Sequence, residues 1–240
     1  MEVEKPMYDR VLLKLSGEAL SGEKGTGLDF FVMKEVCLAI KRCVDMGVQV
    51  GIVVGGGNFW RGVKNGEGKM ERSRADRMGM LATVMNALAL CDAFEQNGVD
   101  ARVMTAVAMQ GFGEPFSRDQ AVRYLEDGKV VIFGCGTGSP YFTTDTAGVL
   151  RALEIGANAI LLAKNIDGVY SADPSKDPSA VKYETITYDE MLAKHLAVMD
   201  TAATSMAMEN RLPIEVFALK QPENIVQVVC GKKIGTSVIL

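Results

Sequence analysis

Short apolar runs alternate with longer stretches of helical periodicity along the whole of this 240-residue chain. The runs are too short for helices and rich in β-branched residues, so we expect them to form strands. In the stretches between them, apolar residues recur every three or four positions, which is typical of amphipathic helices. This alternation predicts an α/β fold, a three-layer αβα sandwich with a mainly parallel sheet. We find no linker, repeat or low-complexity segment, and we therefore expect residues 1–240 to form a single domain.

The expected strands are residues 8–15, 48–54, 100–104, 130–133, 158–163, 213–218 and the terminal TSVIL. The expected helices are residues 28–46, a long helix from Ser73 or Asp76 to Gly98, a short one from Ser117 to near Gly128, one following Asp145, one from Thr187 that carries His195, one from Asp200 and one from Pro222. Ser117 and Gln120 have the spacing of a capping box, as do Thr187 and Glu190. Residues 22–27 are expected to form a flexible loop.

The most informative stretch is residues 130–148, VVIFGCGTGSPYFTTDTAG. A buried strand is followed by glycines at alternate positions, then by Thr143, Thr144 and Asp145, and then by a helix. An α/β fold presents backbone N–H groups to an anion in this way. The alternative interpretation is a tight turn in which Thr or Asp caps the helix.

Three further strands end in loops with related features. Lys14 interrupts an apolar strand just before a glycine turn, Gly55 begins a run of three glycines, and Lys164 ends another strand. A lysine at such a place needs an anion unless it reaches solvent at a sheet edge, and close backbone approach to a ligand requires glycine. Because the carboxyl ends of parallel strands share one edge of a sheet, four such loops predict two phosphate-bearing ligands there. Arg61, with a fork that suits phosphate, follows the three glycines, although a solvated loop arginine is the alternative.

Composition excludes several classes of protein. A net charge of −4 argues against a dedicated nucleic-acid binder. The chain has no evident apolar run of the ~20 residues that span a bilayer, and its first ten residues lack the apolar core of a signal peptide. The five cysteines form no C-x-x-C pair, which favours reduced thiols in a cytoplasmic protein without a disulfide or zinc site. His195 is the only histidine, so histidine triads and multi-histidine metal sites are excluded.

Two common nucleotide-binding motifs are missing from the sequence. There is no G-x-x-x-x-G-K-[ST] of a P-loop enzyme, and no G-x-G-x-x-G between a strand and a helix.

Asp76 lies near the start of the long helix, where it is either a first-turn helix acid or an acceptor for ribose hydroxyls.

Five segments resemble those of bacterial uridylate kinases (UMP kinases) of the amino acid kinase superfamily: VLLKLSGEAL, VGIVVGGGNFWRG, DRMGMLATVMN, GTGSPYFTTDTAG and DGVYSADPSKDP. The resemblance runs from about Tyr8 to the C-terminus. It implies an αβα sandwich without a Walker loop, a homohexamer, and the reaction of MgATP with UMP to give ADP and UDP in pyrimidine nucleotide biosynthesis. Residues 22–27 match a stretch that is linked in this family with an allosteric response to GTP.

The resemblance also implies site residues. The catalytic residues would be Lys14, Arg61 and Asp145. ATP would be bound by Lys14, Ser16, Gly17, Gly57 and Arg61 at its phosphates and by Lys164, Asn165, Tyr170 and Asp173 on the adenine and ribose side; relatives often have threonine at position 164. UMP would be bound by Gly56, Asp76, Thr137, Gly138, Ser139, Pro140, Tyr141, Phe142, Thr143 and Thr144.

The sequence leaves two other functions open. One is a superfamily relative that phosphorylates a carboxylate or carbamate such as acetylglutamate, and the TTDTAG loop together with Asp76 favours a nucleotide acceptor instead. The other is a non-catalytic ATP-binding protein, which would not need Lys14, Arg61 and Asp145. The acceptor phosphate of UMP has a second pKa of about 6, so a general base is not required at neutral pH.

Overall fold

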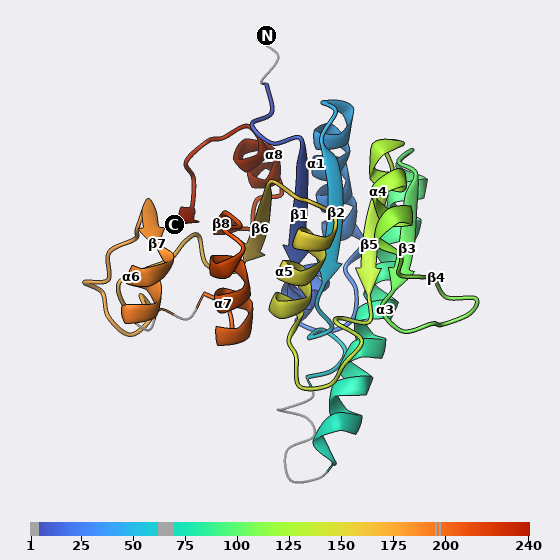
Figure 1. The fold of residues 1–240 in the computed structure, drawn as a ribbon, viewed down its shortest axis with the longest axis horizontal. Coiled ribbons are helices and arrows are strands. Elements are labelled where there is room, and N and C mark those ends of the chain that lie inside the picture. The colour runs from blue at the N-terminus through green and yellow to red at the C-terminus, as the bar shows by residue number, and fades with distance from the viewer. Residues whose placement is uncertain (1–4, 62–69, 195, 197) are drawn as a thin grey trace.

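A nine-stranded β-sheet forms the middle layer of the computed structural model, which describes residues 5–61, 70–194, 196 and 198–240. The strands are β1 (Arg10–Leu15), β2 (Gln49–Val54), β3 (Ala101–Thr105), β4 (Glu114–Pro115), β5 (Val130–Gly134), β6 (Ala159–Lys164), β7 (Thr185–Thr187), β8 (Ile214–Ala218) and β9 (Thr236–Ile239). Their order across the sheet is β4-β3-β5-β2-β1-β6-β8-β9-β7 (Figure 1). Every neighbouring pair is parallel except β8 and β9, as the sequence predicted for a mainly parallel sheet.

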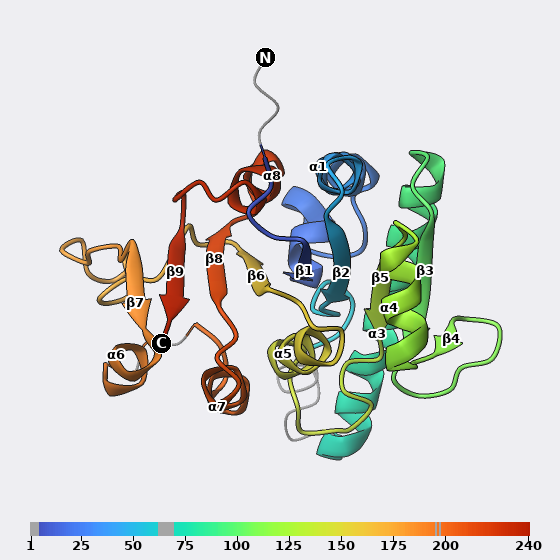
Figure 2. The ribbon, with the colours of Figure 1, turned by 45° about the horizontal axis from the view of Figure 1, so that its top comes forward.

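Helices cover both faces of the sheet. They are α1 (Phe30–Asp45), α3 (Arg72–Gln96), α4 (Arg118–Glu126), α5 (Thr144–Glu154), α6 (Tyr188–Ala193), α7 (Thr201–Glu209) and α8 (Glu223–Val229), with a 3₁₀ segment η1 (Gly17–Lys24) after β1. Figure 2 shows α1 and α8 on one side of the strands and α5, α6 and α7 on the other. The αβα sandwich predicted from the sequence is therefore confirmed.

A hydrophobic core lies on each face of the sheet, between the strands and the helices that cover them. Successive residues of a strand point to opposite faces, so Leu13 of β1 packs into the core under α1, α3 and α8, whereas Leu12 packs into the core under α4 to α7. Phe94 of α3 belongs to the first core and Tyr188 of α6 to the second, and both side chains are almost fully buried.

The long helix α3 has apolar residues on two faces. Leu90 and Phe94 face the sheet and are fully buried. On the opposite face an apolar stripe, which we call the α3 stripe, remains exposed at Met78, Leu81, Met85 and Leu88. These two faces make α3 long and apolar enough, over an 18-residue window with a mean hydropathy of 1.2, to span a membrane by length and composition alone. The expectation that no apolar run approaches the length of a membrane span is thus not met by α3, although the core helices of soluble proteins pass the same test. Leu90 and Phe94 of α3 pack on the sheet.

Several local expectations need correction. Residues 22–24 belong to η1, not to a flexible loop. Ser117 precedes α4 but makes no side-chain cap, so the expected capping box is absent there, whereas the box of Thr187 and Glu190 is formed. The helix after Thr187 ends at Ala193, and His195 lies outside the described residues.

The order of the strands positions the candidate site. β5, β2, β1 and β6 are adjacent and parallel, so the four loops singled out in the sequence emerge side by side at one edge. That edge is the ligand-binding edge expected of an open parallel sheet.

Candidate functional site

Two lysines share one carboxylate at the centre of this edge. The Nζ of Lys14, at the end of β1, lies 2.7 Å from Oδ1 of Asp145 in the first turn of α5. The Nζ of Lys164, at the end of the neighbouring strand β6, lies 3.9 Å from Oδ2 of the same carboxylate. The group has one positive charge in excess in a partly desolvated place, which suits it to a phosphate group. We call Lys14, Asp145 and Lys164 the charge cluster.

The environment of Lys164 changes its acidity. Burial lowers the pKa of its ammonium group and the nearby charge of Lys14 lowers it further, whereas Asp145 acts in the opposite direction. Its Nζ also donates a hydrogen bond to the carbonyl oxygen of Val198. An anion that approached the cluster would stabilise the charged form of Lys164.

The glycine loops after β1 and β2 touch each other through their backbones. A methyl group added at Gly17 would lie 2.4 Å from Oδ1 of Asn58 and 2.7 Å from the carbonyl oxygen of Gly55. Only glycine at position 17 allows the two loops to come this close. The loops that would receive the ATP phosphates therefore form one unit.

A pair of buried asparagines that sequence reasoning missed holds this unit in place. The Nδ2 of Asn86, in α3, donates to the Gly55 carbonyl at 2.7 Å and to Asn58 Oδ1 at 2.8 Å. The Nδ2 of Asn58 donates to Asn86 Oδ1 at 3.0 Å and to the Gly27 carbonyl at 2.7 Å. The signal in the sequence was an asparagine inside the apolar helix segment TVMNALAL, where an unpaired amide would be costly.

Ser16 and Arg61 lie on the outer side of these loops. The Ser16 side chain caps η1 by accepting a hydrogen bond from the Ala19 N–H at 3.2 Å. Arg61 forms an ion pair with Glu18 of η1, and Gly57 lies next to Arg61. The guanidinium is thus at the rim of the glycine loops, within the part of the site expected to bind phosphate.

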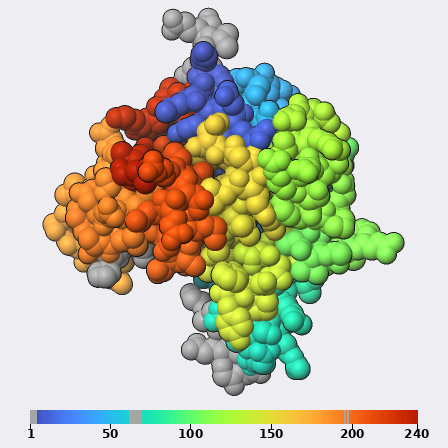
Figure 3. All heavy atoms as spheres, viewed as in Figure 1, coloured from blue at the N-terminus to red at the C-terminus, as the bar shows by residue number. Residues whose placement is uncertain are grey.

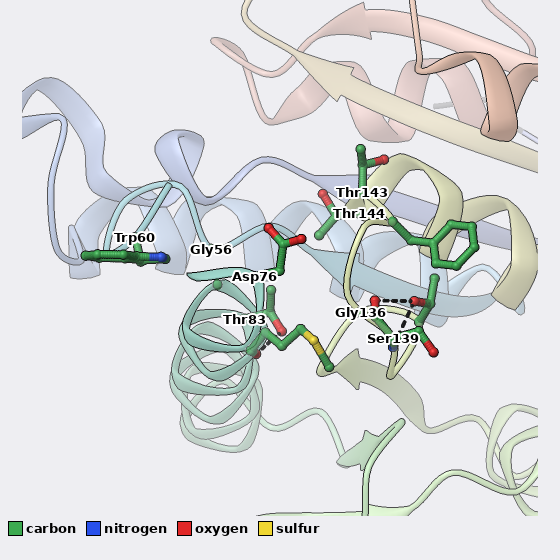
Figure 4. A pocket seen from close by; sticks show the side chains of 12 residues that line it. Gly56, Trp60, Asp76, Thr83, Gly136, Ser139, Thr143 and Thr144 are labelled. Atoms are coloured by element: carbon green, nitrogen blue, oxygen red, sulfur yellow. Dashed lines mark hydrogen bonds between the residues drawn. The ribbon is translucent and has the colours of Figure 1, made fainter. Parts of the chain in front are cut away.

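The first pocket of the site, which we call the acceptor pocket, has a volume of about 150 Å³ and lies between α3 and the loop after β5 (Figure 4). Its lining consists of Gly56, Trp60, Asp76, Gly79, Met80, Thr83, Gly136, Thr137, Ser139, Phe142, Thr143 and Thr144. Seven of the residues expected to bind UMP are among them: Gly56, Asp76, Thr137, Ser139, Phe142, Thr143 and Thr144. Gly138, Pro140 and Tyr141 belong to the same loop but do not line the pocket.

Asp76 is held by two neighbours. Its carboxylate accepts hydrogen bonds from Arg72 Nε at 2.8 and 2.9 Å and from the Tyr141 backbone N–H at 2.9 Å. The helix begins at Arg72 with Glu71 as its capping residue, so the interpretation of Asp76 as a first-turn acid is wrong. Asp76 faces the pocket and fastens the loop at Tyr141.

Asp200 is a second residue that sequence reasoning did not assign to the site. It was expected only to start a helix, which it does by accepting a hydrogen bond from the Ala203 N–H. Its carboxylate also accepts hydrogen bonds from the hydroxyls of Thr143 and Thr146. Burial by itself would raise the pKa of Asp200, but these hydrogen bonds outweigh burial and lower it. Asp200 thereby ties α7 to the start of α5, where Thr143 caps the helix that carries Asp145.

A second pocket of about 480 Å³ adjoins Lys164 on the other side of the charge cluster. Tyr170 and Asp173, both expected on the adenine and ribose side of ATP, line it. Asn165 does not: it lines a separate pocket between η1, α1 and the chain around Lys220. The structure therefore brings together three of the four residues expected on that side.

The donor groups at the site fit a magnesium ion that is carried by the substrates. In the part of the chain that the structure describes, no group of three or more His, Cys, Asp or Glu side chains could hold a metal. Asp145 is the single carboxylate within the charge cluster, and Mg²⁺ is commonly bound by one or two carboxylates together with substrate phosphates.

Comparisons with known proteins agree with this geometry. Residues 9–218 match the amino acid kinase family. The chain is similar to the solved structure of a UMP kinase from Bacillus anthracis, with 37% identity, a TM-score of 0.93 and coverage of 97% of this chain and 96% of that one. A UMP kinase from Ureaplasma parvum is similar at 37% identity, with a TM-score of 0.92 and coverage of 97% and 99%. A uridylate kinase from Archaeoglobus fulgidus is similar at 30% identity, with a TM-score of 0.74 and coverage of 95% and 99%.

These similarities confirm the resemblance seen in the sequence motifs. They extend over nearly the whole chain, and they agree with an αβα sandwich whose glycine loops gather at one edge of the sheet. The chain therefore belongs to the amino acid kinase family.

Proposed function

We propose that this protein transfers the γ-phosphate of ATP to UMP and releases ADP and UDP. The observation that carries the proposal is the charge cluster between two pockets: Thr144, next to Asp145, lines the acceptor pocket, and Lys164 lines the second. UMP would occupy the first pocket and the nucleoside of ATP the second. The three solved relatives described above are UMP and uridylate kinases, which supports this choice of acceptor.

In this mechanism the protein supplies charge and position. At neutral pH the phosphate of UMP is already a dianion, so its oxygen can attack without a general base. Lys14 and Lys164 would offset the charge on the transferring group, Asp145 would orient both ammonium groups, and Arg61 with the glycine loops would hold the ATP phosphates. A Mg²⁺ ion bound by the phosphates near Asp145 would neutralise further charge.

The specificity for the base provides the main test of the proposal. Thr137 and Ser139 of the loop after β5 line the acceptor pocket, where the polar groups of this loop would pair with the uracil edge. Cytosine reverses the donor and acceptor pattern of that edge. Buried groups left unpaired by the wrong base reduce kcat/KM strongly, so we expect UMP to exceed CMP by roughly 10²-fold or more. An assay of ADP release with UMP, CMP, dUMP, AMP and acetylglutamate measures this. Comparable values for UMP and CMP, transfer to acetylglutamate instead, or ATP binding without transfer would each contradict the proposal.

The substitution Asp76→Asn tests whether Asp76 accepts a hydrogen bond from the ribose of UMP. Asparagine keeps the shape but loses the charge and one acceptor oxygen. We expect a raised KM for UMP, an almost unchanged KM for ATP and a nearly normal melting temperature. We also expect wild type to disfavour dUMP and the variant to narrow that preference. Steady-state kinetics with UMP and dUMP measure both effects.

Two kinetic results for Asp76→Asn would contradict the expected role of Asp76, and they differ in what they exclude. If the ratio of kcat/KM for UMP to kcat/KM for dUMP is the same in wild type and variant, Asp76 does not contact the 2′-hydroxyl of the ribose. An unchanged KM for UMP as well would leave it only the role of fastening Tyr141 and Arg72.

The α3 stripe and the cysteines bear on how the protein assembles and where in the cell it acts. The α3 stripe is an uncovered apolar face, and we propose that other copies of the chain cover it in a homohexamer. No disulfide joins any of the five cysteines, all of which lie within the described residues, and this supports a reducing, cytoplasmic compartment. The reaction would belong to pyrimidine nucleotide biosynthesis, with residues 22–27 as the segment for a response to GTP.

A further inference from the structure

A buried hydroxyl connects helix α3 to the loop that forms the acceptor pocket. Thr83 is almost fully buried, with only 2% of the residue exposed. Its Oγ1 donates a hydrogen bond to the carbonyl oxygen of Met80 at 2.7 Å and accepts one from the backbone N–H of Cys135 at 2.8 Å. The single proton of the hydroxyl is thus directed at Met80, which leaves a lone pair for Cys135.

Cys135 needs such a partner. It is the first residue after β5, it is 3% exposed, and its φ of 68° is unusual for a residue other than glycine. A buried N–H without an acceptor is costly, and a backbone in the left-handed region persists only where its surroundings hold it. The bond from Cys135 to Thr83 meets both needs at the point where the loop leaves the sheet.

The loop is attached to α3 a second time. The N–H of Tyr141 bonds to Asp76, six residues further along the loop and seven residues earlier in the helix. Seven residues are about two helical turns, or about 10.5 Å along the axis. The segment between Cys135 and Tyr141 is therefore laid along one face of α3, and in Figure 3 the loop and the first turns of α3 lie side by side at the end of the molecule.

The same turn of α3 supports the other wall of the pocket. A methyl group added at Gly56 would lie 2.8 Å from the Gly79 carbonyl oxygen and 3.1 Å from the Thr83 backbone nitrogen. Figure 4 shows Thr83 between Gly56 and the loop. Both walls of the acceptor pocket thus rest on the residues around Thr83.

We propose that Thr83 is a positioning residue for the loop of residues 135–143, which we call the acceptor loop: it sets the register of this loop along α3 and thereby the affinity for the acceptor nucleotide. The hydroxyl is occupied by Met80 and Cys135, so it acts through the loop. The identity of the acceptor as UMP rests on the proposed function, but the role of Thr83 in holding the loop does not.

The test compares three variants. Thr83→Val keeps the shape and loses the hydroxyl, and Thr83→Ser restores it. Thr105→Val is the matched control, because Thr105 is 1% exposed, pairs with Gly134 in the sheet, and has an Oγ1 without a hydrogen-bond partner among the described residues. Hydrogen–deuterium exchange of peptides covering residues 135–144 reports on the loop whatever the enzyme's substrate, and steady-state kinetics report on the acceptor.

We expect Thr83→Val to raise the exchange rate of the loop and to raise the KM for UMP about tenfold, the factor that corresponds to losing one buried hydrogen bond. The KM for ATP should change less than about twofold, because the glycine loops after β1 and β2 keep all their hydrogen bonds in this variant. Thr83→Ser and Thr105→Val should resemble wild type in both measurements.

Two results would overturn the inference. One is loop exchange in Thr83→Val no faster than in Thr105→Val. The other is a KM for UMP that rises no more than the KM for ATP, which would indicate a general loss of structure. A wild-type enzyme that does not phosphorylate UMP would refute the proposed function, and the exchange measurement would still decide the role of Thr83.

Discussion

Lys14→Met is expected to lower the rate of phosphoryl transfer by two orders of magnitude or more, while the protein remains folded. Removal of one group that stabilises transition-state charge typically costs about 10²–10³ in kcat. Lys14 is only 9% exposed and contacts Asp145 at 2.7 Å, so methionine, which has a flexible side chain of similar length, can occupy the same place but cannot offset the charge of the transferring group. The measurement is kcat with saturating UMP and ATP, together with the melting temperature.

Two further variants separate catalysis from folding. Lys41→Met removes a surface lysine that pairs with Asp45 on α1, and it should leave kcat unchanged. Loss of Lys14 also leaves the half-buried Asp145 facing the more distant Lys164, which lowers stability. Lys14→Met combined with Asp145→Asn should recover stability without recovering activity. A single variant that kept more than about a tenth of the wild-type rate would assign Lys14 a structural role instead.

Gly17→Ala is expected to reduce kcat/KM for ATP about 10²-fold or more and to lower the melting temperature. The added methyl group would meet Asn58 Oδ1 at 2.4 Å and the Gly55 carbonyl at 2.7 Å, and neither partner can move freely because Asn86 holds both. The two phosphate loops would have to separate, and misplacement of about 1 Å is enough to cost 10²-fold in rate. Steady-state kinetics in ATP at saturating UMP measure the effect.

The control for this substitution is Gly47→Ala, at the end of α1. Gly47 has a φ of 89°, and a methyl group there would meet nothing within 4 Å. The control should therefore lose roughly 1 kcal/mol of stability from backbone strain and keep its kinetics. If Gly17→Ala behaves like Gly47→Ala, the contact between the two glycine loops has no part in ATP binding.

The features that could be predicted from the sequence are those that depend on local pattern. Lys14 was recognisable because a lysine rarely interrupts a buried strand, and the loop after β5 because glycines and hydroxyls follow each other there. The edge shared by the four loops followed from the parallel sheet. The capping box of Thr187 was correct, since capping depends on residues three positions apart.

The features that could not be predicted depend on contacts between distant segments. Asn58 and Asn86 are 28 residues apart, Thr83 and Cys135 are 52 apart, and Asp200 reaches Thr143 across 57 residues. Each of these side chains has an ordinary local interpretation, as a loop residue, a core residue or a helix cap. Only the folded chain reveals which buried polar groups they satisfy.

Helix α3 connects two surfaces that would otherwise be independent. One face holds the acceptor loop through Asp76 and Thr83, and the opposite face is the α3 stripe. A partner that binds the stripe more tightly when the acceptor pocket is filled must, by thermodynamic reciprocity, tighten acceptor binding by the same factor. The concentration of the protein and the affinity for its acceptor would then be linked variables, and a binding isotherm recorded at one protein concentration would not describe the molecule at another.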